Sequence, residues 1–260
     1  MTADQPTGPG VRFAVDGTTA TVTLDRPRSR NSQTPATWRA LAEFGEGLPD
    51  DVRVVVVRGE GPAFSAGLDR SMLDPATTGE ETVAGLLAQD DEAISATIDA
   101  YQRGFTWLRD PRFVSIAAVQ GYAIGAGFQL ALACDLRVVA DDVQFCMKES
   151  ALGLVPDLTG TKPLVEAVGY ARALEICATA RMVGAAEAVD IGLALAAVPA
   201  AELDGTVADL AAALTAALPG AVRETKALLL GAASRELDEQ RRLEREAQVR
   251  RFRELAAMMM

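Results

Sequence analysis

The most informative absence in this 260-residue chain is histidine, of which there is none. Serine and cysteine nucleophiles that depend on a histidine base are therefore excluded, and so are zinc sites built on imidazole. Any proton transfer near neutral pH must fall to Asp, Glu, Lys, Tyr or Cys.

Cysteine is also scarce. Cys134, Cys146 and Cys177 lie in apolar stretches without CxxC spacing, so we expect buried free thiols rather than a disulfide or a metal site. The chain opens on a polar, proline-rich stretch that lacks the apolar segment of a secretory signal. These features predict a cytoplasmic, reducing location.

Basic residues are in deficit, with 25 Lys and Arg against 36 Asp and Glu, which gives a net charge of −11. This balance argues against non-specific binding to nucleic acid. The length and the hydrophobic content of 49% fit one large domain, or one domain with an appendage, around a sizeable core. No segment has the composition of a domain linker.

What the chain does contain is a glycine-rich passage from Gln120 to Asp135. The apolar run before it, Val114 to Val119, predicts a buried strand, and the good helix formers after Gly127 predict a helix. The first amides of a helix lack backbone partners and carry partial positive charge, so they attract a negative oxygen. Because Gly125 and Ala126 have almost no side chain, a substrate carbonyl could reach those amides.

Three other interpretations of this passage compete with an anion site. Nothing charged lies between Arg112 and Asp135, as in a membrane span, but the glycines and glutamines and the lack of a second span argue against a membrane. A dinucleotide fingerprint is excluded because its third glycine would fall at Leu130. A purely structural strand-to-helix turn is compatible with this stretch alone.

Hydrophobic periodicity predicts most of the other elements. Alternation around Asp16-Gly17 predicts a hairpin over 11–24, and the spacing of Trp38, Leu41 and Phe44 is helical. The remaining expected strands are 52–57, 136–140, 143–147 and 194–198, and the remaining expected helices are 91–108, 163–169, 170–179, 185–192, 202–218, 222–233 and 235–257.

Two loops and one polar segment are further candidates for binding. The glycine-rich loop from Gly59 to Asp69 follows a buried strand, where ligand sites of α/β folds gather. Arg26, Arg28 and Arg30 cluster in a loop that could hold phosphates, and a solvated loop is an equal alternative. The polar segment 71–110 has the composition of a mobile or variable cover.

Two carboxylates follow the strand expected at 143–147. Glu149 and Asp157 stand beside apolar residues, which favours raised pKa values and proton transfer. The alternative is that such a carboxylate is merely paired with Lys148 or Lys162.

Taken together, these passages resemble the crotonase family, also called the enoyl-CoA hydratase/isomerase family. The resemblance covers nearly the whole chain. It implies an α/β fold, a crotonase-like ββα spiral over 1–195 that binds acyl-CoA, with a helical C-terminal trimerisation region over 196–260 and assembly as a homotrimer or hexamer. The matching motifs are Asp25-Arg26-Pro27 with Asn31, Phe64-Ser65-Ala66-Gly67-Leu68-Asp69, Gln120 to Asp135, Glu149 with Gly153 and Pro156, and Glu187-Ala188 with Gly192-Leu193.

The resemblance also implies the binding site. The backbone N–H groups of Leu68 and Ala126 would form an oxyanion hole for the thioester enolate, since fixed dipoles stabilise charge that develops on the oxygen. Arg26, Arg28 and Ala66 would bind CoA. No metal or redox cofactor is implied, because CoA enters as part of the substrate.

The acid–base positions depart from the pattern of the hydratases, which resemble one another in carrying two glutamates. The second matches Glu149, but the first matches Gln129, which cannot accept a proton at ordinary pH. Asp157 resembles the second carboxylate of the dienoyl-CoA isomerases of the family, although their further Asp at the Gln129 position is absent. We therefore expect a double-bond isomerase that uses Glu149 and Asp157.

Two alternatives stay open. The first is an enoyl-CoA hydratase in which Gln129 positions water and Glu149 acts alone, and the second is a non-catalytic acyl-CoA-binding protein. Decarboxylases, hydrolases and dehalogenases also occur in the family. The acyl group is not determined by the sequence, and we expect its pocket to be bounded by 71–108 and by Tyr122, Phe128 and Leu158.

Overall fold

A six-stranded sheet organises the molecule. The computed structural model describes residues 9–74, 76–77, 79 and 81–259. β1 and β2 pair antiparallel and the later pairs are parallel. The strands lie in the order β1 (Val11–Asp16), β2 (Thr19–Leu24), β3 (Val54–Gly59), β4 (Val114–Val119), β6 (Leu136–Ala140) and β9 (Ala196–Val198).

The sequence pattern accounts for the hairpin and for the buried strands. Gly17 turns the hairpin with a φ of 54°, a conformation that favours glycine. The apolar run of β3 is buried on both faces, as is usual for a parallel strand. Because side chains alternate along a strand, Val55 and Val57 join one core while Val54 and Val56 join another.

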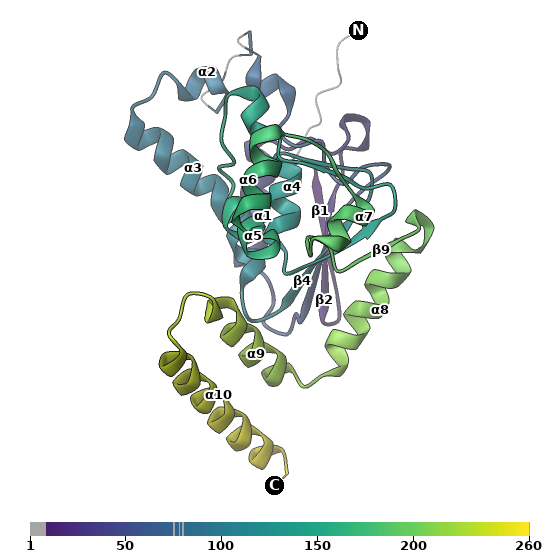
Figure 1. The fold of residues 1–260 in the computed structure, drawn as a ribbon, viewed down its shortest axis with the longest axis vertical. Helices are drawn as coiled ribbons and strands as arrows, with labels where there is room; N and C mark the ends of the chain where they lie inside the picture. The colour runs from purple at the N-terminus through teal and green to yellow at the C-terminus, as the bar shows by residue number, and fades with distance from the viewer. Residues whose placement is uncertain (1–8, 75, 78, 80, 260) are drawn as a thin grey trace.

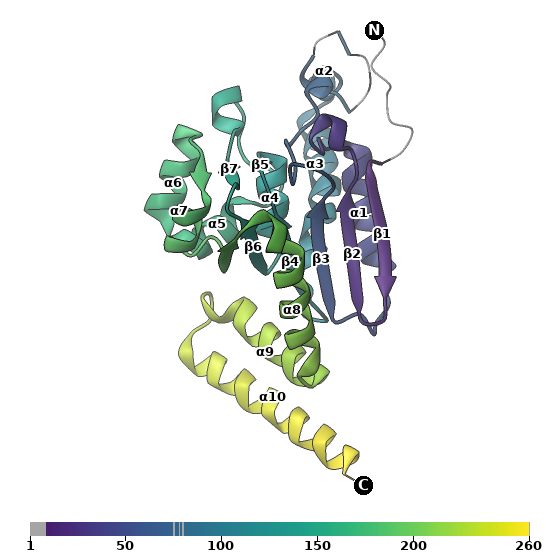
Figure 2. The ribbon, with the colours of Figure 1, turned by 90° about the vertical axis from the view of Figure 1, so that its right-hand side faces the viewer.

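Helices cover both faces of this sheet. The larger core lies under α1 (Pro35–Glu46), α3 (Asp91–Thr106) and α4 (Ala126–Ala133). On the opposite face α8 (Leu203–Ala216) packs through Leu203, Val207 and Ala211. Figure 2 shows α8 in front of the sheet, with α1 and α3 behind it.

A smaller three-stranded sheet stands beside the first one (Figure 2). It consists of β5 (Tyr122–Ile124), β7 (Gln144–Cys146) and β8 (Val183–Gly184). The chain passes from β4 to β5 and α4, then back from β6 to β7, so it alternates between the two sheets. This alternation confirms the expected crotonase-like ββα spiral.

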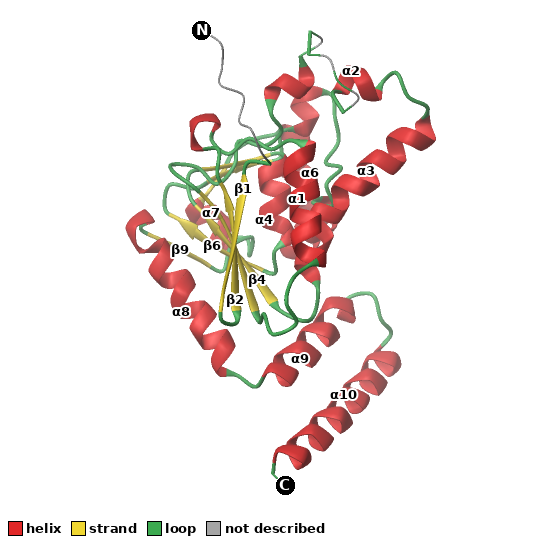
Figure 3. Cartoon of the chain, turned by 180° about the vertical axis from the view of Figure 1, so that it is seen from behind, coloured by secondary structure: helices red, strands yellow, loops and turns green. Residues whose placement is uncertain are grey.

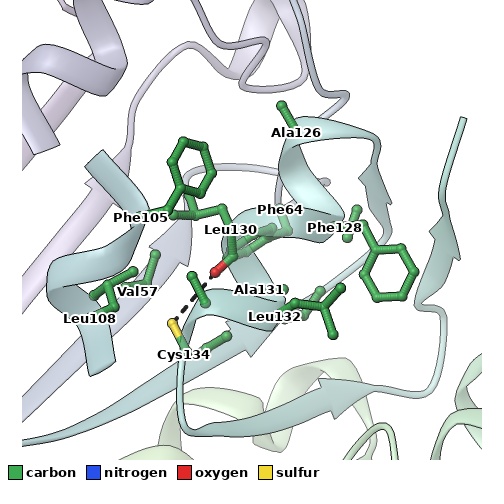
Figure 4. Close-up of a cluster of buried hydrophobic side chains, with 14 of the residues drawn as sticks. Val57, Phe64, Phe105, Leu108, Ala126, Phe128, Leu130, Ala131, Leu132 and Cys134 are labelled. Atoms are coloured by element: carbon green, nitrogen blue, oxygen red, sulfur yellow. Dashed lines mark hydrogen bonds between the residues drawn. The ribbon is translucent and has the colours of Figure 1, made fainter. Parts of the chain in front are cut away.

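The central passage leads from strand through glycine into helix, as predicted, but an additional short strand, β5, which the pattern does not predict, lies between β4 and α4. All eight residues of α4 are buried. Figure 4 shows Leu130 beside Phe105 on one side of the helix, and Phe128 with Leu132 on the other. With eight residues, α4 is much shorter than the about 20 apolar residues that a membrane-spanning helix needs.

Most predicted elements are confirmed, and their ends shift for local reasons. α3 ends at Thr106 and continues as a 3-10 turn over Trp107–Arg109. α9 (Pro219–Ala232) begins at Pro219 rather than at 222, because proline is well suited to a first helical turn. The pattern does not predict β8, since two residues carry no period. The remaining helices are α2 (Val83–Leu86), α5 (Thr161–Val168), α6 (Tyr170–Thr179), α7 (Ala185–Asp190) and α10 (Leu237–Met258).

The last two helices project from the body and pack on each other (Figures 1 and 3). β9 and α8 also follow residue 195, yet they belong to the body through the sheet and through its second core. The helical region that stands clear of the sheet therefore begins at α9. Within the described ranges no single helix is long and apolar enough to cross a membrane, and α8 with α9, which reach that length and composition together, are bent by 104°.

One buried lysine fastens α9 to the body. The Lys226 ammonium donates to the carboxylate of Asp135 and to the carbonyl oxygens of Asp110 and Phe113, each over 2.7 Å. Ser115 donates to the same carboxylate from its backbone N–H and its hydroxyl. Every donor of the ammonium is thus used, as a buried charge requires.

We expect Lys226→Met to destabilise the protein by about 3–5 kcal/mol, because it leaves Asp135 as an unpaired buried charge. Urea denaturation at one fixed protein concentration measures this loss. The matched control is Lys162→Met, which removes an exposed pair with Glu166 and should cost about 0–1 kcal/mol. Equal losses in the two variants would contradict the anchoring role of Lys226.

Candidate functional site

Two glycine-rich loops meet at the ends of β3 and β5. Ser65 donates its backbone N–H to Tyr122 O over 2.8 Å, and Ile124 N–H donates to Ser65 O over 3.0 Å. Gly67 has a φ of 85°, and a Cβ at this position would collide with Ile124 O and lie 3.4 Å from Ala126 N. The close approach of the two loops therefore requires glycine at 67.

This contact brings the two predicted oxyanion donors into one neighbourhood. Leu68 directly follows Gly67, and Ala126 is the first residue of α4, whose N–H has no acceptor inside the helix. Within the described part of the chain, neither N–H has a protein acceptor. Their role as a pair of donors to one substrate oxygen stays a prediction.

Glu149 lies beside these loops, in the short 3-10 helix that follows β7. The residue is 8% exposed. Its Oε1 accepts from Gln129 Nε2 over 2.8 Å, and its Oε2 is buried without a hydrogen-bond partner among the described residues. A Cβ on Gly125 would lie 3.1 Å from Oε1, so the carboxylate faces the residue before Ala126.

Burial raises the pKa of Glu149, and the charge of Asp157 adds to the rise, while the hydrogen bond from Gln129 opposes it. The alternative of a simple lysine pair does not hold, since Lys162 binds Glu166 over 2.9 Å and Lys148 is exposed with no ion pair to Glu149 within the described ranges. A buried carboxylate with a free oxygen and a raised pKa is suited to take up a proton.

Gln129 is held at both ends of its amide. Its Nε2 donates to Glu149, while its Oε1 accepts from Leu158 N–H over 2.9 Å and from Gly160 N–H over 3.2 Å. A Cβ on Gly160 would lie 2.6 Å from the Gln129 side chain, so this approach also needs glycine. Sequence reasoning missed these two amides, because nothing in a sequence marks a contact across about thirty positions.

Asp157 lies in the same segment, and Gln102 of α3 donates to its backbone oxygen over 2.7 Å. Desolvation raises the pKa of its carboxyl. The residue nevertheless retains an exposed surface, so water screens this carboxyl more than that of Glu149. The two predicted carboxylates thus lie near enough to influence each other, in unlike surroundings.

The three loop arginines have different environments. Arg26 binds Asp69 over 2.9 Å and donates to Ser32 O over 2.9 Å, so its guanidinium is committed to the protein. Arg28 is exposed, and Arg30 lies 5.5 Å from the ring centre of Tyr122. Ala66 N–H donates to Arg30 O over 2.7 Å, which joins this loop to the 59–69 loop. CoA binding by Arg26, Arg28 and Ala66 stays a prediction, and the contacts of Arg26 favour another use for it.

The three side chains expected to bound an acyl pocket also differ in their burial. Phe128 is fully buried and packs against Phe145 in a tilted arrangement at 4.9 Å between ring centres, so it belongs to the core and not to a pocket wall. Leu158 is buried and Tyr122 is exposed. Cys134 and Cys146 are buried free thiols as predicted, and Cys177 is half-buried.

The described residues contain no group of three or more Cys, Asp or Glu side chains that could hold a metal ion.

A ββα spiral that carries two amide loops beside a buried carboxylate defines the crotonase class of enzymes. The family model described as enoyl-CoA hydratase/isomerase matches residues 15–258. The chain belongs to this family.

Solved structures agree with this assignment over the full length. A candidate enoyl-CoA hydratase from Thermobifida fusca, crystallised with CoA, is 50% identical with a TM-score of 0.91, over 96% of this chain and 95% of that one. Its complex with acetoacetyl-CoA is 50% identical with a TM-score of 0.90, over 95% and 96% of the two chains.

Curated relatives carry both activities in their names. The probable enoyl-CoA hydratase echA8 of Mycobacterium tuberculosis is 30% identical over 62% of this chain and 57% of its own length. The peroxisomal Δ(3,5)-Δ(2,4)-dienoyl-CoA isomerase of Arabidopsis thaliana is 34% identical over 50% of this chain and 47% of its own. The chain thus spans about half the length of the curated relatives that it matches.

The pH dependence of kcat/KM for an enoyl-CoA should reflect Glu149. Because its pKa is raised, activity should fall as the pH drops through a value above the ordinary range of glutamate. Gln129→Met removes the donor that lowers this pKa, so the acid limb should move to higher pH. Gln102→Met, which loses a bond to the same segment but none to Glu149, is the control. An acid limb that moves equally in both variants would contradict the assignment.

We also expect Glu149→Gln to stabilise the protein at neutral pH. A pKa raised by folding means that ionisation costs free energy in the folded state, a cost that grows as pH rises from the unfolded to the folded pKa. The gain should be on the order of 1 kcal/mol, since a pKa change of one unit corresponds to about 1.4 kcal/mol. Urea denaturation below pH 5 and at neutral pH should show the gain only at neutral pH. The control has the opposite sign, since Glu187→Gln removes the Arg181 bond that lowers the pKa of Glu187 and should not stabilise.

Proposed function

We propose that this member of the enoyl-CoA hydratase/isomerase family moves a carbon–carbon double bond along an acyl-CoA chain. The observation that carries the proposal is Oε2 of Glu149, buried without a partner among the described residues, beside a Gln129 amide that is bonded to protein at both its nitrogen and its oxygen. One carboxylate is therefore placed for proton transfer, while the other glutamate position of the hydratases is occupied by Gln129, which cannot accept a proton.

Hydration by two acidic groups has little support from these contacts. An amide cannot accept a proton from water, and both ends of the Gln129 amide are already bonded to protein. A positioned general base is worth about 10²–10⁴ in rate. The loss of one such group favours a reaction in which no water is activated.

Isomerisation needs only the groups that are present. Oε2 of Glu149 takes the proton from C2 of a 3-enoyl thioester, and the C–H electron pair moves into the carbonyl to form a dienolate. The Leu68 and Ala126 N–H groups stabilise the oxygen charge. Asp157, whose pKa is raised by desolvation, returns a proton at C4 in this scheme. The double bond re-forms between C2 and C3, and in a 3,5-dienoyl thioester the proton returns at C6 instead.

The Thermobifida fusca protein crystallised with CoA and with acetoacetyl-CoA supports an acyl-CoA thioester as the ligand of this chain. Neither a metal nor a redox cofactor takes part in the proposed steps. Arg28 and Arg30 are better placed than Arg26 for the phosphates of CoA, because the Arg26 guanidinium already binds Asp69.

The projecting C-terminal helices support an assembly of several copies. α10 leaves large apolar side chains exposed in a single chain, among them Leu237, Phe252 and Met258, with Phe252 63% exposed. Such a patch fits burial against further copies. We propose a homotrimer or a hexamer, as the family resemblance implies.

The test uses 3-hexenoyl-CoA, whose conversion to the conjugated 2-enoyl thioester increases ultraviolet absorbance. Glu149→Gln should lower the isomerisation rate by about 10²–10⁴. Asp157→Asn should also lower it, but C2 proton exchange with deuterated solvent should persist, because Glu149 still removes that proton. Asp141→Asn, an exposed acid on a turn, is the control and should match the parent.

Two outcomes would overturn the proposal. Hydration of crotonyl-CoA that is faster than isomerisation by the parent protein would establish a hydratase. Normal binding of acyl-CoA without turnover or C2 exchange would establish a binding protein.

A further inference from the structure

A buried polar chain runs from α1 to the loop that carries Leu68. Trp38 Nε1–H donates to Gln33 Oε1 over 2.8 Å, and Gln33 Nε2–H donates to Ser65 Oγ over 3.0 Å. Gln33 and Ser65 are fully buried. The proposed reaction does not use these side chains, and their hydrogen bonds are to other groups of the protein.

The Ser65 hydroxyl has no spare hydrogen-bonding capacity. It donates to Asn31 O over 2.7 Å, and it accepts from Gln33 Nε2 and, over 3.2 Å, from Gly67 N–H. A hydroxyl has one donor and two acceptor lone pairs, so each is occupied. Its orientation is therefore fixed by its three partners.

The orientation of the Gln33 amide is fixed as well. The indole of Trp38 can only donate, so it must face Oε1, and this leaves Nε2 directed at Ser65. In such an arrangement each group determines the next one, from Trp38 through Gln33 to Ser65.

The main chain of Gln33 holds the same loop on both sides of Leu68. Gln33 N–H donates to Gly67 O over 2.7 Å, and Asp69 N–H donates to Gln33 O over 2.8 Å. The two peptide groups that flank Leu68 are thus bonded to one residue. The direction of the Leu68 N–H follows from the direction of the Gly67 carbonyl, because both belong to the same peptide plane.

Ser65 also contacts the second loop. A Cβ on Gly127 would lie 2.7 Å from Ser65 Cβ and 3.0 Å from Ser65 Oγ, so this side chain packs on the first turn of α4. A displaced Ser65 would therefore alter the position of the Leu68 N–H relative to that of Ala126.

We propose that Gln33 is a positioning residue that fixes the Leu68 N–H against the thioester oxygen, by orienting Ser65 with its side chain and bracketing Leu68 with its main chain. The proposal rests on the oxyanion hole of the proposed function. Loss of the Gln33 amide should therefore reduce the polarisation of the bound thioester carbonyl more than it reduces the affinity for CoA.

The test variant is Gln33→Met, which keeps the volume and the main-chain bonds but removes the side-chain bonds to Trp38 and Ser65. Infrared difference spectra of a ¹³C=O-labelled acyl-CoA report the hydrogen bonds to the thioester oxygen. In the parent the carbonyl stretch should lie below its frequency in solution, and in Gln33→Met it should return part of the way.

Loss of a whole oxyanion donor costs about 10²–10³ in rate, so a misdirected donor should lower C2 proton exchange by about 10–100-fold. Affinity for CoA, measured by calorimetry, should stay within about twofold. The matched control is Gln120→Met, since Gln120 bonds to Gly59 O and Gly61 O of the same loop but not to Ser65. Its carbonyl stretch should match that of the parent.

Two further variants keep the test decisive if Gln33→Met does not fold. Trp38→Phe removes only the first donor and should shift the carbonyl stretching frequency in the same direction as Gln33→Met, by a smaller amount. Ser65→Ala removes the last link and should shift it by at least as much as Gln33→Met.

Several results would overturn the role of Gln33. If Gln33→Met folds and keeps the carbonyl shift of the parent, the positioning role is refuted, but the oxyanion hole is not. If only Ser65→Ala folds, the same result in that variant leads to the same conclusion. A parallel loss of CoA affinity and exchange would indicate general loosening of the loop. A parent that leaves the carbonyl at its solution frequency would refute the oxyanion hole itself, and with it both proposals.

Discussion

The backbone at Gly67 packs directly on the backbone of Ile124 and Ala126, with no space for a side chain, and the rest of the site depends on this contact. It joins the end of a strand in the main sheet to the start of a buried helix, and two hydrogen bonds between Ser65 and β5 hold it. Each loop alone would be an ordinary connection. Together they place in one small region two main-chain N–H groups that have no protein acceptor among the described residues.

A carboxylate beside that region costs folding free energy, because burial disfavours its charge. The hydrogen bond from Gln129 offsets part of this cost, and one oxygen of Glu149 has no hydrogen-bond partner among the described residues. Gln129 in turn is held by the N–H groups of Leu158 and Gly160, in the segment that carries Asp157. The Gln129 amide thus connects Glu149 to the segment that carries Asp157, although it cannot itself transfer a proton.

The C-terminal region shows a different balance. Lys226 fastens α9 to the body through a fully satisfied buried charge, whereas α10 packs on α9 and leaves apolar side chains exposed. In a single chain these apolar side chains remain in contact with water, which is unfavourable. The net charge of −11 does not by itself argue against a phosphate-bearing ligand, because screening limits the effect of distant charges to about 8 Å at physiological salt.

Periodicity and local propensities within about a dozen residues were enough to predict the hairpin, the buried strands, the strand-to-helix passage and most helices. The sequence also determined the family and the candidate residues, since motif order survives in the linear chain. Tertiary structure alone decided how these residues are used. Arg26 binds Asp69, Phe128 is buried in the core, and Gln129 accepts hydrogen bonds from two backbone N–H groups about thirty positions away. Such partners lie far apart in sequence, and only packing decides which of them meet.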